Sequence, residues 1–171
     1  MANKDLTAIL SAQRKAAQAE LPVSSSVRKD RLTRTIAMLV DHGQRFVDAL
    51  SEDFGHRSAD QSWMTDIATP IRQLKHARKH VDRWMRPERR PLDFPLGLLG
   101  ARARIEYQPK GVIGVISPWN FPVQLTVGPL AGIFAAGNRA MVKSSEFTPT
   151  VAALFEEVAP SYFAEDELSF V

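Results

Sequence analysis

Residues Pro109 to Pro149 constrain the fold more than any other part of this chain. Their sequence, PKGVIGVISPWNFPVQLTVGPLAGIFAAGNRAMVKSSEFTP, predicts a strand, a helix, a second strand and the start of another helix. Gly111–Ser117 is a short run rich in valine and isoleucine, the pattern of a strand that is buried on both faces. Arg139–Lys143 is the second strand. Two strands joined by a helix through short connections predict a parallel pair, so we expect an α/β fold.

The helix between these strands is expected to end at Gly137, because glycine commonly follows a helix C-terminus. Asn120 and Pro122 are expected near its beginning, since asparagine is a common helix cap and proline fits the first turn. Thr148 is expected to cap the next helix. In parallel sheets the loops after the carboxyl ends of the strands line the ligand crevice. The loops that carry Asn120 and Lys143 are therefore where chemistry is expected.

The residues before this stretch predict a helical region. Asp5–Leu21 has a thin apolar stripe, and Val27–Leu50 has apolar residues three and four apart, as in a single amphipathic helix. Ser58–Met85 shows the same spacing with Pro70 inside it, which predicts either a kink or two helices that meet there. Arg86–Gly100 contains three prolines and two glycines and is expected to be an extended connector.

Two segments predict how this region joins the rest of the fold. Ala101–Tyr107 alternates between apolar and polar residues, the pattern of a half-exposed strand that is antiparallel or at an edge. The change to a buried strand at Gly111 predicts that the chain passes from one sheet to another. Leu168–Val171 begins as a buried strand, and a domain does not usually end there, so we expect the chain to be part of a longer protein.

Composition excludes several classes of protein. The 171 residues are 44% hydrophobic and 24% charged, as in soluble globular proteins, and the net charge of +3 neither requires nor excludes an anionic partner. There is no cysteine, and hence no disulfide framework, thiolate metal site or thiol nucleophile. The N-terminus is too charged for a signal-peptide core, and Phe121–Gly137 is short for a membrane span. We therefore expect a cytoplasmic protein without a membrane partner.

A basic segment and a histidine pair allow two other interpretations. Arg72–Arg90 is rich in arginine and lysine, which leaves nucleic-acid binding as an alternative. Its basic residues interleave with a complete apolar stripe, so a solvated helix face is favoured and no nucleic-acid partner is expected. His76 and His80 are one helical turn apart, but no further ligands are nearby, so we expect no metal site.

Three polar residues at the expected ligand edge have both a functional and a structural interpretation. Asn120 could donate its side-chain amide to a developing oxyanion, although its residue type alone favours a helix cap or a turn residue. Lys143 could reach a ribose or a phosphate, or extend into water. Glu146 could accept the two hydrogen bonds of a ribose diol, or could favour the start of the next helix. Each of these signals is weak when taken alone.

The joint pattern is far more specific. The segments PKGVIGVISPWNFP and AAGNRAMVKSSEFTP together resemble the aldehyde dehydrogenase superfamily, whose members carry P-x-G-V-x-x-x-I-x-P-W-N-F/Y-P, a helix rich in glycine and alanine, and then A-G-N-x-x-V-x-K-x-S-E-x-T-P. The predicted helices, connector and alternating strand also occupy the places that the family pattern predicts. The segments SPWNFPV and KSSEFTP are most similar to those of the coniferyl-aldehyde dehydrogenase branch.

The resemblance implies a division of the chain. Residues 1–100 would be the N-terminal helices and connector of the cofactor-binding domain. Residues 101–110 would begin the oligomerisation ribbon, and residues 111–171 would form an incomplete, Rossmann-like NAD-binding domain. The fold implied is therefore the N-terminal part of an aldehyde dehydrogenase, with the catalytic domain absent.

The resemblance also implies roles for single residues. Asn120 would donate its side-chain amide to the thiohemiacetal oxyanion, and Lys143 and Glu146 would hold the adenosine ribose. A glutamate at position 146 favours a free 2′-hydroxyl and repels a 2′-phosphate, so NAD is expected to be preferred over NADP. The cofactor-binding residues implied are Ile116, Ser117, Pro118, Trp119, Lys143 and Glu146.

The reaction implied is the NAD-dependent oxidation of an aldehyde, of the aromatic coniferyl type, to its carboxylic acid by a homodimer or homotetramer. In this family the nucleophilic cysteine lies beyond the point where this chain stops, so we expect the 171 residues alone to be inactive. The alternative is a non-catalytic relic that binds a nucleotide or a partner.

Overall fold

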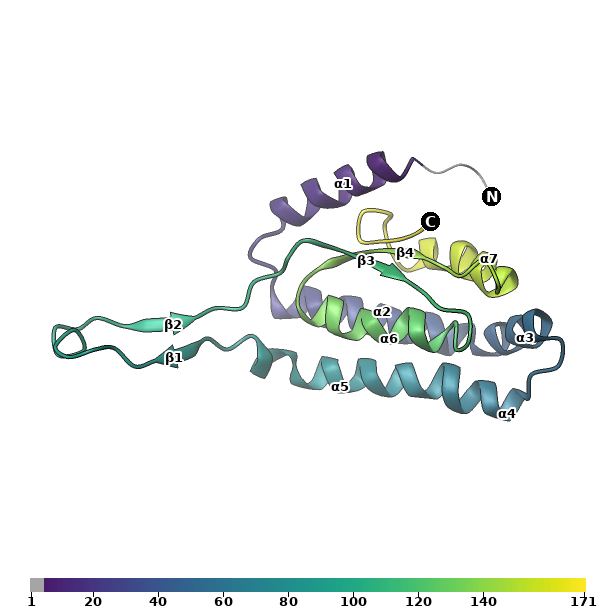
Figure 1. Ribbon diagram of the computed structural model, residues 1–171, viewed down its shortest axis with the longest axis horizontal. Helices are drawn as coiled ribbons and strands as arrows, with labels where there is room; N and C mark the ends of the chain where they lie inside the picture. Colours follow the sequence, from purple (N-terminus) through teal and green to yellow (C-terminus); the bar gives the residue numbers. More distant parts are fainter. Residues whose placement is uncertain (1–4) are drawn as a thin grey trace.

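The computed structural model describes residues 5–171 as an elongated α/β body from which a β-hairpin projects (Figure 1). The helices are α1 (Leu6–Ala19), α2 (Ser25–Asp41), α3 (Gly43–Phe54), α4 (Ala59–Ser62), the π-helix η1 (Trp63–Ala68), α5 (Thr69–Trp84), α6 (Gln124–Ala135), α7 (Pro149–Val158) and the 3₁₀ turn η2 (Ala159–Ser161). The strands are β1 (Glu88–Arg90), β2 (Ala103–Ile105), β3 (Val112–Ile116), β4 (Arg139–Lys143) and β5 (Leu168–Phe170).

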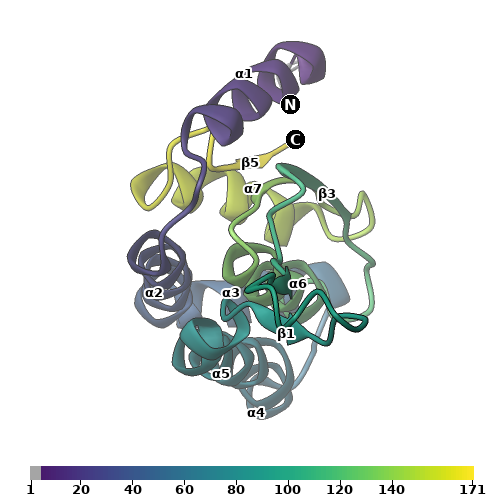
Figure 2. The ribbon, with the colours of Figure 1, turned by 90° about the vertical axis from the view of Figure 1, so that its left-hand side faces the viewer.

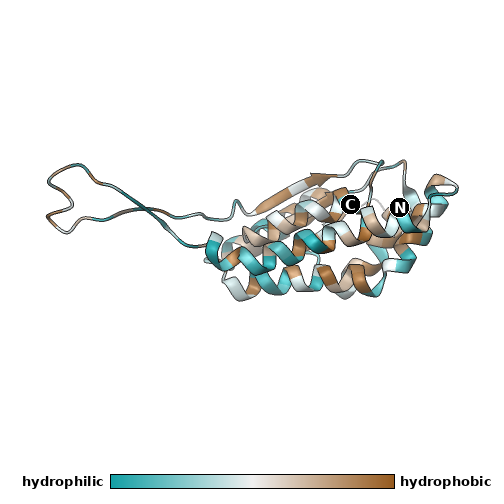
Figure 3. Cartoon of the chain, turned by 90° about the horizontal axis from the view of Figure 1, so that it is seen from below, coloured by the Kyte–Doolittle hydropathy of each residue, from teal (hydrophilic) through white to brown (hydrophobic). Residues whose placement is uncertain are grey.

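The centre of the body is a parallel sheet of three strands in the order β3-β4-β5. Helix α6 connects β3 to β4 and α7 connects β4 to β5, which confirms the predicted Rossmann-like α/β arrangement. Helix α1 lies on one side of the sheet and α6 on the other, with α2 and α5 packed beyond α6 (Figures 1 and 2). Hydrophilic and hydrophobic residues alternate along the helices of the body, as expected for helices that bury one face (Figure 3).

The prediction of one helix over Val27–Leu50 is wrong. Helix α2 ends at Asp41 and α3 begins at Gly43, with His42 in a non-helical conformation between them. The apolar spacing continues across this break because both helices bury residues in the same core. A side chain at position 43 would clash, since a Cβ atom there would lie 2.6 Å from the ring of Trp63. Glycine at position 43 is therefore required by a tertiary contact, which periodicity cannot reveal.

Neither alternative for Pro70, a kink or two helices that meet, describes the structure fully: α4, the π-helix η1 and α5 follow one another without a break, and Pro70 lies in the first turn of α5. Gly137 follows α6 as predicted, with a φ of 83°. Pro122, which was expected in the first turn of that helix, lies in the turn just before it, and Pro129 lies inside it. The boundary differs because the side chain that caps α6 comes from a distant part of the chain, as described below.

Strand β3 is not buried on both faces, as was predicted. It is an edge strand among residues 5–171: Ile113 and Val115 are half-buried, Gly114 is exposed and Ile116 is 85% exposed. The fully buried strand positions belong instead to the central strand β4, at Ala140 and Val142. A run of valine and isoleucine thus identified the strand but not its place in the sheet.

The segment Arg86–Gly100 is not merely an extended connector. It contains β1, which pairs antiparallel with β2 so that Glu88 lies opposite Ile105, and the two form the projecting hairpin (Figure 1). Strand β1 consists of Glu-Arg-Arg, which has no apolar alternation, and so it left no signal in the sequence. The predicted passage from this sheet to a second, parallel one is confirmed.

A network of ion pairs ties α1 and α2 to the segment before β5. The fully buried guanidinium of Arg31 donates to Glu20 at 2.7 Å and to Glu167 at 3.0 Å, and Arg34 donates to Glu167 at 2.8 Å. Burial alone would raise the pKa of Glu167, but the hydrogen bonds from Arg34 and Arg31 outweigh it and lower this pKa to about 2.

This network predicts that the chain loses stability in acid. Because the folded state lowers the pKa of Glu167 from 4.5 to about 2, its contribution is complete above pH 4.5 and disappears as the pH falls to about 2. Converting this shift gives a contribution of about 3 kcal/mol. Urea unfolding across this range should show Glu167→Gln less stable than the original chain near neutrality and equal to it in strong acid. Glu157→Gln, which removes an exposed ion pair, is the control, and an equal loss at all pH values would contradict the assignment.

Candidate functional site

The two loops that were expected to carry chemistry leave the parallel sheet side by side. Ile116 and Lys143, the last residues of β3 and β4, are partners in the strand register. The backbone N–H of Ser117 donates to the carbonyl of Lys143 at 3.0 Å, which extends the pairing past the end of β3. The carboxyl ends of the strands thus bring the two predicted groups of residues to one edge of the sheet.

The first loop presents mostly exposed, apolar surface. Ile116 is 85% exposed and Trp119 is 54% exposed, and Pro118 between them is also exposed. Ser117 differs, since its side chain is buried and its Oγ accepts a hydrogen bond from Thr126 Oγ1 of α6 at 2.8 Å. Ser117 can therefore meet a ligand at this edge only through its backbone.

Asn120 does not cap α6, so the prediction of a helix cap at this residue is wrong, and Asn120 lies instead in the bend before the helix. The helix begins at Gln124, and its first free amides, those of Val123 and Gln124, donate to Oδ1 of Asp66 at 3.2 Å each. Asn120 is exposed, and within residues 5–171 its side-chain amide makes no hydrogen bond. Its carbonyl accepts a hydrogen bond from Nη1 of Arg57 at 3.1 Å. The backbone of Asn120 is thus held while its amide remains available.

Lys143 and Glu146 form an accessible ion pair in the second loop. Nζ of Lys143 lies 2.8 Å from Oε2 of Glu146, and their side chains are 52% and 71% exposed. The hydrogen bond from Lys143 lowers the pKa of Glu146, which keeps this carboxylate ionised. Glu146 does not cap α7, because the carboxylate of Asp53 accepts from the first amides of that helix, those of Thr150 and Val151, at 2.9 Å each.

Three residues that support the site were missed from the sequence: Asp53, Arg57 and Asp66. Thr148 was expected to cap α7, but it makes no side-chain hydrogen bond there and Asp53 takes that role. A signal for Asp66 did exist, since this carboxylate falls on the apolar stripe of its helix and is fully buried. Because both helix starts are occupied by carboxylates, neither α6 nor α7 offers free N-terminal amides to a phosphate group.

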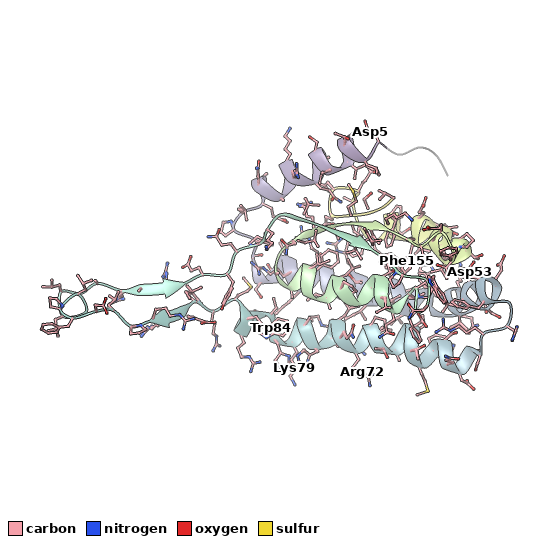
Figure 4. All side chains as sticks on the ribbon, viewed as in Figure 1. Asp5, Asp53, Arg72, Lys79, Trp84 and Phe155 are labelled. Atoms are coloured by element: carbon pink, nitrogen blue, oxygen red, sulfur yellow. The ribbon has the colours of Figure 1, made fainter. Side chains whose placement is uncertain are left out.

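The other functional interpretations gain no structural support. Across residues 5–171 no group of three or more histidine, cysteine, aspartate and glutamate side chains is placed to hold a metal ion. The rings of His76 and His80 pack on each other at 4.1 Å, and Trp84 stacks on His80. The side chains of Arg72 and Lys79 point away from the body into solvent (Figure 4). In the same described part of the chain, no helix combines the length and the apolar character that a membrane span needs.

Comparisons with known proteins place this geometry in a family. A model of the aldehyde dehydrogenase family matches residues 1–164. A coniferyl aldehyde dehydrogenase from Pseudomonas sp. is 49% identical over 168 residues, which are 98% of this chain and 34% of that protein. A probable coniferyl aldehyde dehydrogenase from Caulobacter vibrioides is 48% identical over 162 residues, which are 94% of this chain and 33% of that protein. The chain thus spans about a third of the length of these relatives.

Solved structures share the fold. The substrate-bound state of Staphylococcus aureus AldH aligns with a TM-score of 0.89 at 25% identity, over 98% of this chain and 36% of that chain. A succinic semialdehyde dehydrogenase from Streptococcus pyogenes, solved with NADP⁺, aligns with a TM-score of 0.83 at 18% identity, over 100% of this chain and 36% of that chain. The motifs, the fold and the matched residues agree, and the chain belongs to the aldehyde dehydrogenase family.

Proposed function

We propose that this chain supplies the cofactor-side part of an NAD-dependent aldehyde dehydrogenase that oxidises an aromatic, coniferyl-type aldehyde to its acid. The observation that carries the proposal is the edge of the parallel sheet, where the side-chain amide of Asn120, unbonded within residues 5–171, and the accessible pair Lys143–Glu146 follow neighbouring strands. The identity of almost half with a coniferyl aldehyde dehydrogenase supports the class of substrate.

The proposal includes a division of labour along the chain. Residues 1–100 and 111–171 would build the cofactor-binding domain, and residues 101–110 would begin the ribbon through which a homodimer or homotetramer assembles. The tip of the projecting hairpin supports such an assembly, because Phe94, Leu98 and Leu99 are 86%, 80% and 77% exposed there. The enzyme would act in the cytoplasm, as the composition predicts.

The residues at the sheet edge fit a dinucleotide whose adenosine ribose is not phosphorylated. The ionised carboxylate of Glu146 can accept hydrogen bonds from both hydroxyls of a ribose diol, and the ammonium of Lys143 can donate one. A 2′-phosphate would instead face a like charge at Glu146. Exposed apolar surface at Ile116 and Trp119 suits the flat faces of a nucleotide. When bound, NAD would supply the hydride acceptor of the reaction.

Asn120 would stabilise the charge that develops on the aldehyde oxygen when a nucleophile adds to the carbonyl carbon. A donor that is already oriented gains most at this step, because it need not reorganise as the charge appears. Asn120 meets this condition, since its backbone is held by Arg57 and its amide is free within the described residues. The sequence contains no cysteine, so a thiolate nucleophile would come from outside these 171 residues, and the chain alone would be inactive.

A chimera tests this function. The chain would replace the matching 168 residues of the Pseudomonas coniferyl aldehyde dehydrogenase, and NADH formation would be followed with coniferyl aldehyde as substrate. We expect NAD-dependent turnover by the chimera and none by the 171-residue chain. A chimera that folds and assembles like the Pseudomonas enzyme but does not oxidise the aldehyde would contradict the proposal and favour a non-catalytic, nucleotide- or partner-binding chain.

Replacing Glu146 with serine should relax the preference for NAD in this chimera. At a separation of about 4 Å, repulsion between two unit charges is worth about 1 kcal/mol in water and about 4 kcal/mol near a protein surface. We therefore expect the ratio of kcat/KM for NAD to that for NADP to fall by about 10-fold or more. Glu157→Ser, which removes an exposed carboxylate from α7, should leave the ratio unchanged. An unaltered ratio in Glu146→Ser would remove this residue from the ribose site.

A further inference from the structure

A buried ion pair joins the N-terminal helices to the loop that carries Asn120. Nη2 of Arg57 lies 2.8 Å from Oδ2 of Asp66, and the two side chains are only 7% and 0% exposed. Desolvation makes such a pair a weak source of stability compared with apolar residues of similar volume. Its contacts with the Asn120 loop point to a different role.

The two carboxylate oxygens of Asp66 bind different parts of the protein. Oδ2 accepts a hydrogen bond from Arg57, whereas Oδ1 accepts hydrogen bonds from the backbone amides of Val123 and Gln124 at 3.2 Å each. A carboxylate at this place satisfies amides that would otherwise be unpaired, and it complements the positive end of the α6 dipole. Asp66 thus fixes the end of the loop at which α6 begins.

Arg57 holds the other end of the same loop. Its Nη1 donates to the carbonyl of Asn120 at 3.1 Å. Its guanidinium also lies 5.0 Å from the ring centroid of Phe121, the next residue in the loop, and 4.9 Å from that of Phe54 at the end of α3. Arginine suits this position because one planar group can donate hydrogen bonds and stack on aromatic rings at once.

The element that carries Asp66 is itself fixed. Asp66 belongs to the π-helix η1, a form that is rare and occurs often at functional sites. Helix α3 packs so closely on η1 that a Cβ atom on Gly43 would lie 2.6 Å from the ring of Trp63. The carboxylate therefore projects from a packed support rather than from a free helix end.

We infer that Arg57 and Asp66 are positioning residues that hold the Asn120 loop in the conformation in which the amide can serve an oxyanion. The two residues contact the loop on both sides of Pro122, while the side chain of Asn120 remains free within residues 5–171. The inference rests on the proposed function of Asn120, so the test must separate the two.

The first arm of the test measures amide hydrogen exchange in the 171-residue chain. Arg57→Gln leaves Asp66 buried without its cation and can prevent folding, so the double variant Arg57→Met/Asp66→Ala, which is uncharged and lacks the acceptor for the α6 amides, is measured beside it. We expect exchange of the amides of Val123 and Gln124 to rise by about 10-fold, as for the loss of a helix cap. Arg57→Lys, which keeps the charge but loses the planar fork, should give an intermediate rise.

Asp53→Ala is the matched control, because Asp53 caps α7 in the way that Asp66 caps α6. It should raise exchange at Thr150 and Val151 and leave exchange at Val123 and Gln124 unchanged, whereas the Arg57 and Asp66 variants should raise exchange at Val123 and Gln124 only. Unchanged exchange of the amides of Val123 and Gln124 in the folded double variant would overturn the inference.

The second arm measures kinetics in the chimera. The double variant should lower kcat by about 10-fold while KM for NAD changes by less than about 2-fold, since only the orientation of a transition-state donor is lost. In an Asn120→Ala background it should cause no further loss of kcat, because residues that act through one another are not additive. If Asn120→Ala alone leaves kcat unchanged, the proposed function fails while hydrogen exchange still tests the positioning. If Asn120→Ala lowers kcat and the double variant does not, the positioning role fails alone.

Discussion

Replacing Asn120 with alanine is expected to lower kcat of the chimera by about 100-fold or more, the usual cost of removing one oxyanion donor. The expected loss is large because the structure holds the backbone of Asn120 through Arg57 and leaves its side-chain amide unbonded within residues 5–171. KM for NAD should change little, since this amide is assigned to the transition state and not to the ribose.

Two further variants sharpen this experiment. Asn120→Asp keeps the shape of the side chain but replaces the amide donor with an acceptor, so it should be at least as slow as the alanine variant. Gln44→Ala removes another exposed amide, one that donates to Asp48 within α3, and should leave kcat unchanged. A chimera whose kcat survived Asn120→Ala, or in which Asn120→Asp remained fully active, would exclude Asn120 from the mechanism.

The parts of the fold that could be predicted are those whose causes are local. The unit β3–α6–β4 was predictable because its apolar runs are bounded by glycine and proline, as at Gly111, Pro118 and Gly137. The break between α2 and α3 was not, because both helices bury residues in the same core and the apolar spacing continues across the break. The strand Glu88–Arg90 could not be predicted either, because its three residues show no apolar alternation and it forms by pairing with β2.

The same distinction between local and distant causes applies to the residues of the candidate site. Asn120, Lys143 and Glu146 could be predicted because they lie within one stretch whose joint pattern is specific, although each residue alone favoured a structural interpretation. Their supports could not, because Asp66 caps an amide 57 residues away and Asp53 caps one 97 residues away. The two aspartates explain why Asn120 does not cap α6 and why Thr148 does not cap α7: the first amides of these helices already donate to Asp66 and Asp53.

Phe155 is the packing link between the helical region and the α/β part of the chain. Its side chain is fully buried, and its ring centroid lies 4.7 Å from that of Phe46 in α3 and 4.8 Å from that of Phe170 in β5, with which it is stacked. Phe155 lies in α7, the helix whose first amides donate to Asp53 of α3, and Figure 4 labels both residues. One aromatic cluster therefore supports the helix that follows the Lys143–Glu146 loop.

Replacing Phe155 with alanine is expected to reduce the free energy of unfolding by about 3–5 kcal/mol, the cost of truncating a buried aromatic side chain. Phe94→Ala makes the same chemical change at a side chain that is 86% exposed, and should alter stability by less than about 0.5 kcal/mol. Urea unfolding of the 171-residue chain measures both, and equal effects would show that the aromatic cluster does not form. Because α7 begins next to the Lys143–Glu146 loop, a folded Phe155→Ala chain should also exchange the amides of Thr150 and Val151 faster than the original chain. Stability and site geometry would then be lost together, as expected if the N-terminal helices serve as the support on which the Lys143–Glu146 loop is built.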